Sequence, residues 1–90
     1  MFAEVNRYFL NYREGSFKDP EGKNVSFAKL TVCDKEGSVE SFSVLPDDRH
    51  NMLLACEELN LFDTVSVSLE IRGSGKYMKA YAESIRGREV

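Results

Sequence analysis

Two patterns in the sequence predict a single, mostly β domain that contains one helix. In most segments apolar and polar residues alternate with a period of two, which is typical of strands with one buried face. One stretch instead spaces its apolar residues every three or four positions, as in an amphipathic helix. The 90 residues suffice for one core but leave little room for a deep catalytic cavity. No repeat or low-complexity stretch divides the sequence, so we expect residues 1–90 to form one domain.

The first part of the chain is predicted to be a strand followed by a long loop. Ala3–Arg13 is rich in β-branched and aromatic residues, and its imperfect alternation predicts a long, bent strand. Glu14–Asn24 contains two glycines and an Asp-Pro pair, which favour turns. We therefore expect a long, mobile hairpin loop that carries Phe17.

The second and third strands are predicted at Val25–Asp34 and Val39–Leu45. The alternation in the second strand is regular. Its core face is predicted to comprise Ala28, Leu30 and Val32. Phe27 and Lys29 then lie on the outer face.

A helix is predicted after Pro46, which ends the third strand. Asp47 and Asp48 favour a helix start because carboxylates interact well with the positive end of the helix dipole. The helix is expected to end near Asn60. Its apolar stripe is predicted to comprise Met52, Leu53, Ala55, Cys56 and Leu59.

The last two predicted strands form a hairpin. Thr64–Arg72 alternates in nearly pure period two and is the clearest strand of the sequence. Gly73–Gly75 is predicted to turn the chain, and Lys76–Arg86 returns as the final strand. Its inner face is predicted to comprise Met78, Ala80 and Ala82.

Three strands, one helix and two further strands are the element order of the OB-fold, a partly open Greek-key barrel. In that fold the helix fills the space between the third and fourth strands. A β-grasp domain would place its helix after two strands, and an SH3-like barrel would have no helix of this length. The predicted fold class is therefore all-β with one helix, a five-stranded OB-fold barrel.

OB-folds bind ligands on the outer face of strands two and three and on the flanking loops. On that surface the sequence interleaves aromatic and basic residues. Single-stranded nucleic acid requires this combination, because bases stack on aromatic rings while lysine and arginine follow the phosphates. The candidate nucleic-acid-binding residues are Arg13, Phe17, Lys18, Lys23, Phe27, Lys29, Arg72, Lys76, Tyr77 and Lys79.

Three of the aromatic residues have a structural alternative. A register slip of one residue would turn Phe27 into the core. Tyr77 and Tyr81 could instead pack as cross-strand partners in the last hairpin. Phe17 is the most suggestive aromatic, because a large apolar side chain in a turn-rich loop has little local reason to be there unless something covers it.

The strand order, the stretch Phe62–Leu69 and the closing hairpin Gly73–Met78 resemble small single-stranded-DNA-binding proteins. The nearest types are the helix-destabilising proteins of filamentous phages and related mobile elements. The resemblance implies a non-catalytic protein that coats single-stranded DNA without sequence preference during replication or transfer. It also implies a homodimer that binds cooperatively.

Two other functions remain open from the residues. One is a small interaction subunit that docks on a larger replication or conjugation protein through its last two strands. The other is an accessory domain of an enzyme, which no catalytic constellation in the sequence supports. His50 is the only histidine, and we expect it in the first turn of the helix. Cys33 and Cys56 lack zinc-ligand spacing and are expected to be reduced thiols.

We accordingly expect no enzymatic activity, no metal site and no cofactor. The sequence has no apolar run long enough to span a membrane and no basic-then-apolar leader, so we expect a cytoplasmic protein without a membrane partner.

The formal net charge of -3 is unevenly distributed along the chain. Residues 1–45 contribute -1, residues 46–62 contribute -3 and residues 63–90 contribute +1. The excess of acidic residues thus lies on the predicted helix segment. A nucleic-acid-binding surface is expected away from the helix, with modest and salt-sensitive affinity per monomer.

Overall fold

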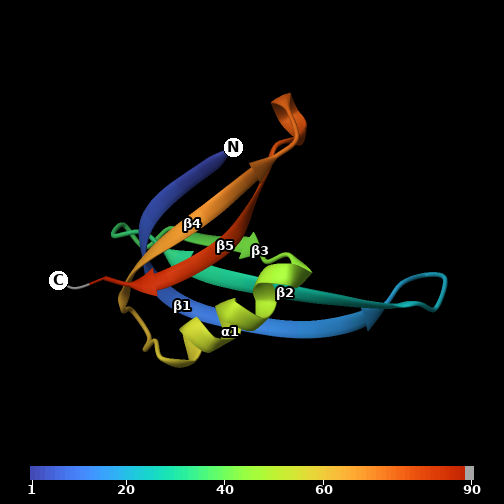
Figure 1. Cartoon of the computed structure of the whole chain (residues 1–90), viewed down its shortest axis with the longest axis horizontal. Helices are drawn as coiled ribbons and strands as arrows, with labels where there is room; N and C mark the ends of the chain where they lie inside the picture. The colour runs from blue at the N-terminus through green and yellow to red at the C-terminus, as the bar shows by residue number, and fades with distance from the viewer. Residues whose placement is uncertain (89–90) are drawn as a thin grey trace.

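Five strands form a closed barrel in the computed structural model, which describes residues 1–88. The strands are β1 (Phe2–Lys18), β2 (Asn24–Cys33), β3 (Val39–Ser43), β4 (Thr64–Arg72) and β5 (Lys79–Gly87). They follow the order β1-β2-β3-β5-β4, and β4 pairs with β1 to close the barrel (Figure 1). A short helix, α1 (Arg49–Glu57), lies between β3 and β4. The structure confirms the predicted five-stranded OB-fold barrel with one helix.

β1 is long and bent, as its imperfect alternation predicted. Its first half, Phe2–Tyr8, pairs with β4, and its second half, Tyr8–Lys18, pairs with β2. The register shifts between Phe9 and Asn11, where an extra residue interrupts the ladder. Such a bulge bends a strand and allows β1 to serve both sides of the barrel.

The prediction of a long loop at Glu14–Asn24 is wrong. β1 continues to Lys18 and β2 begins at Asn24, so only the residues between them connect the strands. Asp19 closes this short turn, because its Oδ1 accepts hydrogen bonds from the backbone N–H groups of Glu21 and Lys23, each at 2.9 Å. Phe17 therefore lies on a strand and not in a loop.

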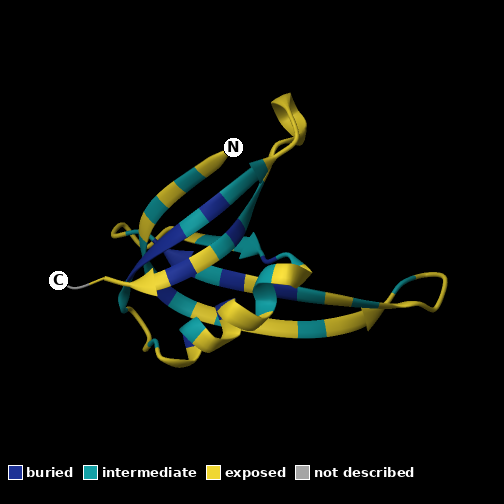
Figure 2. Ribbon diagram, in the orientation of Figure 1, coloured by how far each residue is buried: buried dark blue, intermediate teal, exposed yellow. Residues whose placement is uncertain are grey.

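The core lies between the inner faces of the strands, where the buried segments of the ribbon gather (Figure 2). Ala28, Leu30 and Val32 belong to it, as predicted. Other buried members include Phe9, Val44, Val65, Val67, Leu69, Ala82 and Ile85. Most of these side chains are aliphatic and come from β2, β4 and β5, where the buried residues follow the alternation of each strand. β1 contributes Phe9, and Val44 directly follows the end of β3.

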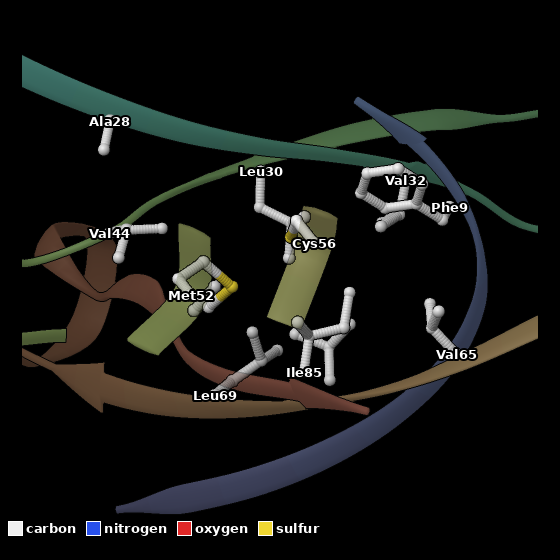
Figure 3. Packing of buried hydrophobic residues seen from close by; sticks show 12 residues of the cluster. Phe9, Ala28, Leu30, Val32, Val44, Met52, Cys56, Val65, Leu69 and Ile85 are labelled. Carbon is white, nitrogen blue, oxygen red and sulfur yellow. The ribbon is translucent and has the colours of Figure 1, made fainter. Parts of the chain in front are cut away.

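The helix is shorter than predicted and buries only part of its apolar stripe. α1 ends at Glu57, before Asn60, and a single 3-10 turn at Pro46–Asp48 precedes it. Met52 and Cys56 point into the barrel among the strand side chains (Figure 3). Leu53, which was predicted to be in the stripe, is exposed, because a helix of this length meets the barrel along a narrow line.

The last strand begins later than predicted. β5 starts at Lys79, since Gly75–Tyr77 forms a 3-10 turn at the tip of the β4–β5 hairpin. Met78 is exposed next to this turn, so its predicted inner position is wrong. The register of β4 and β5 also shifts between Ser68 and Leu69.

Both cysteines are free and buried, as expected for reduced thiols. Burial raises the pKa of the Cys56 thiol from 9.0 to about 11, which keeps the thiol uncharged at neutral pH. Burial also raises the pKa of the Tyr12 hydroxyl from 10.0 to about 12, with a smaller contribution from the nearby charge of Glu14. Within residues 1–88, no helix has the length and apolar character needed to cross a membrane.

Candidate nucleic-acid interface

The outer face of β1 and β2 carries the first group of candidate residues. Gly15 lies opposite Phe27, and Arg13 lies opposite Lys29. Residues that face each other across a ladder share a side of the sheet, and the neighbouring residue Ala28 is buried in the core. Phe27 therefore points outward, and the register slip that would have turned it inward does not occur.

Two rings and a guanidinium gather on this face, and we call Arg13, Phe17 and Phe27 the aromatic platform. The ring centroids of Phe17 and Phe27 are 6.4 Å apart with an interplanar angle of 36°. The Arg13 guanidinium carbon lies 5.8 Å from the centroid of the Phe27 ring. Phe17 remains 54% exposed although it belongs to a strand, so its apolar surface is available to a ligand.

Gly15 allows the Phe27 ring to lie against the backbone of β1. A Cβ atom built on Gly15 would be 2.6 Å from Cζ of Phe27, closer than real Cβ contacts. Gly15 looked like a turn former in the sequence. In the structure it belongs to β1, where the lack of a side chain makes room for the ring.

A row of four residues, Arg13, Lys29, Ser43 and Tyr81, crosses the outer face from β1 to β5. Each is the ladder partner of the next, and Ser43 and Tyr81 form the parallel bridge between β3 and β5. We call these residues the cross-strand row. Adjacent strands are about 4.8 Å apart, so the row extends over about 14 Å.

The two cations of the cross-strand row lie directly opposite each other. Like charges in this arrangement are unfavourable on an antiparallel ladder. Among residues 1–88, none of the ion pairs includes Arg13 or Lys29. A bound anion would therefore relieve their repulsion.

Tyr81 is the main residue that the sequence-based site did not include. Lys79 Nζ lies 5.3 Å and the Arg72 guanidinium carbon 5.8 Å from the centroid of its ring. The signal was available, because Tyr81 shares a face with Lys79 two positions earlier in the last strand. Nothing in the sequence indicated that Tyr81 would lie near β2, because this depends on the pairing of β3 with β5.

Arg72 differs from the other candidate cations because it already has a carboxylate partner. Its Nε lies 3.1 Å from Oε1 of Glu70, and a second guanidinium nitrogen donates a hydrogen bond of 3.1 Å to Oε2. The hydrogen bond and the charge of Glu70 raise the pKa of Arg72. Arg72 is thus less available to a phosphate than Arg13 or Lys29.

The remaining candidate residues lie at two hairpin tips. Lys18 ends β1 and Lys23 lies in the turn that follows. Lys76 and Tyr77 lie at the tip of the β4–β5 hairpin, where Lys76 Nζ is 5.3 Å from the Tyr77 ring centroid. Figure 1 shows that the two tips project in different directions. The structure thus brings together candidates in the middle of the strands, whereas the candidates at the two tips lie apart from each other.

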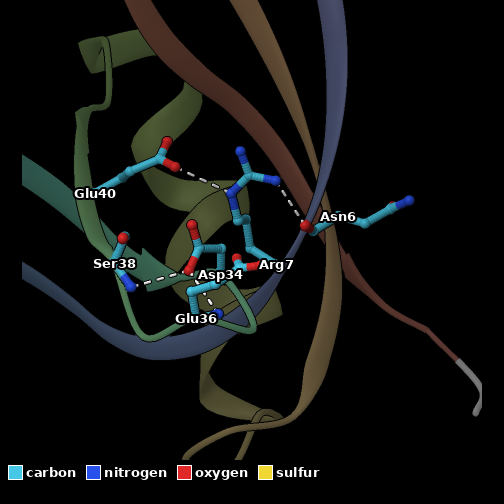
Figure 4. A network of polar contacts seen from close by, with 6 residues as sticks. All are labelled: Asn6, Arg7, Asp34, Glu36, Ser38 and Glu40. Atoms are coloured by element: carbon cyan, nitrogen blue, oxygen red, sulfur yellow. Dashed lines mark hydrogen bonds and ion pairs between the residues drawn. The ribbon is translucent and has the colours of Figure 1, made fainter.

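A cavity of about 450 Å³ lies near Arg7 and Asp34, away from the aromatic platform. The side chains of Arg7 and Asp34 already have partners within the protein (Figure 4). Arg7 forms an ion pair of 3.1 Å with Glu40, and Asp34 accepts backbone hydrogen bonds from Glu36 and Ser38. In the part of the chain that the structure describes, no group of three or more His, Cys, Asp and Glu side chains could hold a metal ion.

The fold and the interface geometry define an OB-fold protein with an outer face of aromatic and cationic side chains. No family model, no curated protein and no solved structure matches the chain.

Proposed function

We propose that this protein is a non-catalytic binder of single-stranded DNA and that the outer face of its barrel forms the binding surface. The observation that carries the proposal is the pair Arg13 and Lys29, two opposed cations without a carboxylate partner among the described residues, beside the rings of Phe17 and Phe27. Phosphates would neutralise the cations, and the neighbouring rings offer flat surfaces to the bases.

The cross-strand row gives the strand a path over the sheet. Small side chains on β3, such as Ser41 and Ser43, lie between the bulky residues of β2 and β5. Phe27, which lies two positions before Lys29 on the same face of β2, and Tyr81, at the β5 end of the row, would each stack with a base. Such contacts are independent of base identity because every base has a π-face.

The acidic residues of the chain support this choice of face. Residues 46–62, which include α1, contribute -3 to the net charge, and α1 packs against the barrel through Met52 and Cys56. The one arginine of the segment, Arg49, donates hydrogen bonds to the carbonyl oxygen of Val44 and to Ser26 Oγ. The carboxylates at the two ends of α1 would therefore repel a nucleic acid, whereas the platform would attract it.

Titration of a fluorescent oligothymidylate at about 50 mM and about 200 mM salt tests the proposal, because released counterions make such binding weaker at high salt. We expect tighter binding at the lower salt concentration and weaker binding to a duplex of equal length. The slope of log K against log salt should be about -0.7 for each phosphate contact. The variant Lys29→Gln is expected to reduce the magnitude of this slope by about 0.7.

Lys35→Gln is the matched control, because Lys35 is an exposed lysine in the turn between β2 and β3 and lies outside the interface. It should leave the slope unchanged. The proposal would be refuted if the protein did not bind at low salt, or if its affinity were the same at both salt concentrations.

Gly15→Ala is expected to weaken oligonucleotide binding several-fold without unfolding the protein. The new methyl group would push the Phe27 ring away from β1, since its position is 2.6 Å from Cζ. Affinity from the titration and the NMR chemical shifts of the Phe27 ring would be measured together. Ser16→Ala, the next position on β1, is the control. If the ring shifts change while the affinity does not, the position of Phe27 is irrelevant to binding.

A further inference from the structure

A turn after the helix presents two large apolar side chains to the solvent. The backbone N–H of Asp63 donates a hydrogen bond of 3.0 Å to the carbonyl oxygen of Asn60, which makes Leu61 and Phe62 the central residues of a four-residue turn. Leu61 is 62% exposed and Phe62 is 61% exposed. Phe62 has a φ of 67°, and within residues 1–88 every other residue with a positive φ is a glycine.

The conformation of this turn is fixed from several sides. The Phe62 N–H donates a hydrogen bond of 2.7 Å to the carbonyl oxygen of Phe9, and the Phe9 N–H donates one of 2.9 Å to the carbonyl oxygen of Asp63. Oδ2 of Asp63 also accepts a hydrogen bond of 2.8 Å from the Asn60 N–H. A positive φ at this turn position favours glycine or asparagine, so an exposed phenylalanine there is strained and gains little burial in return. Such strain is typical of a functional position.

The chain that leads into the turn is acidic, and the hollow beside Phe62 adds no net charge because Asp34 and Lys35 both line it. Glu57 and Glu58 are exposed just before it, and residues 46–62 contribute -3 to the net charge. Two copies that met through this same surface would bring like charges together, which is unfavourable. The complementary partner is apolar and basic.

The tip of the β4–β5 hairpin has that character. Tyr77 is 76% exposed, Met78 is also exposed, and Lys76 and Lys79 flank them. The tip is tightly folded, because a Cβ on Gly73 would lie within 2.4 Å of the backbone oxygen of Tyr77; this glycine has a φ of 91°. The hairpin tip and the turn project from different ends of the barrel (Figure 1).

We propose that the hairpin tip of one copy docks on the Leu61–Phe62 turn of a second copy. The two surfaces are complementary in charge and both expose apolar side chains. Since they differ from each other and lie at different ends, the contact is heterologous and builds an open chain of subunits. This inference goes beyond the proposed function and assigns Lys76 and Tyr77 to a protein contact instead of the nucleic-acid interface.

Sedimentation velocity without nucleic acid tests this contact. The wild-type chain is expected to form a series of oligomers as its concentration rises from micromolar to millimolar, as a small interface is weak. Phe62→Gly, which suits the backbone of the turn, and Tyr77→Ala should each remain monomeric over this range. Val39→Ser removes an apolar residue of similar exposure outside both surfaces and should associate like the wild type.

A mixture of the two monomeric variants distinguishes a head-to-tail contact from a symmetric one. Phe62→Gly retains the hairpin tip and Tyr77→Ala retains the turn, so the mixture should form dimers but nothing larger. A wild-type chain that stays monomeric at millimolar concentration, oligomers in either single variant, or a mixture without dimers would overturn the proposal. Because the experiment contains no DNA, its failure is separate from a failure of the titration.

Discussion

Replacement of Phe27 by alanine is expected to lower the affinity for a single-stranded oligonucleotide by about 5-fold to about 150-fold, the range that corresponds to the loss of one stacked base at about 1–3 kcal/mol. The ring lies on the outer face, beside Phe17 and below the guanidinium of Arg13. Its removal takes away the centre of the aromatic platform but leaves the core intact. Fluorescence titration at constant salt measures the affinity, and a thermal melt verifies the fold.

Phe2→Ala is the matched control for this variant. Phe2 is an exposed phenylalanine on the same strand, β1, but it belongs to the half that pairs with β4. The control should bind like the wild type. A double variant of Phe17 and Phe27 is expected to lose less than the sum of the two single losses, because the two rings are neighbours and under the proposal would stack with the same bases.

The Phe27 experiment also decides between the proposed function and the interaction subunit considered from the sequence. If Phe27→Ala and the wild type bind an oligonucleotide equally well, the aromatic platform does not stack with bases. A folded variant with unchanged DNA affinity would make the exposed rings candidates for contact with a protein instead.

The sequence predicts the outer face of β2 well because the evidence for it is local. Ala28, Leu30 and Val32 alternate with Phe27 and Lys29, and a strand with one buried face has a period of two. The strong burial of the first three residues then determines where the other two point. No contact with a distant part of the chain is needed for that inference.

Features that depend on contacts between distant parts of the chain are harder to predict from the sequence. Gly15 resembles a turn residue locally, but the pairing of β1 with β2 extends through it because Phe27 covers the glycine. Tyr81 becomes a neighbour of the β2 face only when β5 meets β3 in parallel, at its bridge with Ser43. The strained turn at Phe62 has no local signal, since its backbone is held by hydrogen bonds to Phe9 on β1.

Leu30→Ala is expected to lower the free energy of unfolding by about 2–5 kcal/mol. Leu30 has no exposed surface and lies between Tyr12 and Phe42 in the ladders of β2. Removal of its methyl groups would leave a cavity in a closed barrel, where the neighbouring strands cannot easily collapse. Chemical denaturation of the variant and the wild type provides the measurement.

Leu54→Ala gives the control, because Leu54 is 50% exposed on α1 and its loss should change stability by no more than about 0.5 kcal/mol.

The Leu30→Ala variant also tests whether the interface depends on the core. Leu30 points inward from the strand that carries Phe27 and Lys29 on its outer side, so the folded fraction of Leu30→Ala should bind single-stranded DNA with wild-type affinity. The affinity is measured under conditions where the variant is fully folded. If Leu30→Ala then bound single-stranded DNA more weakly than the wild type, the interface would depend on core packing and would not be a preformed surface of the sheet.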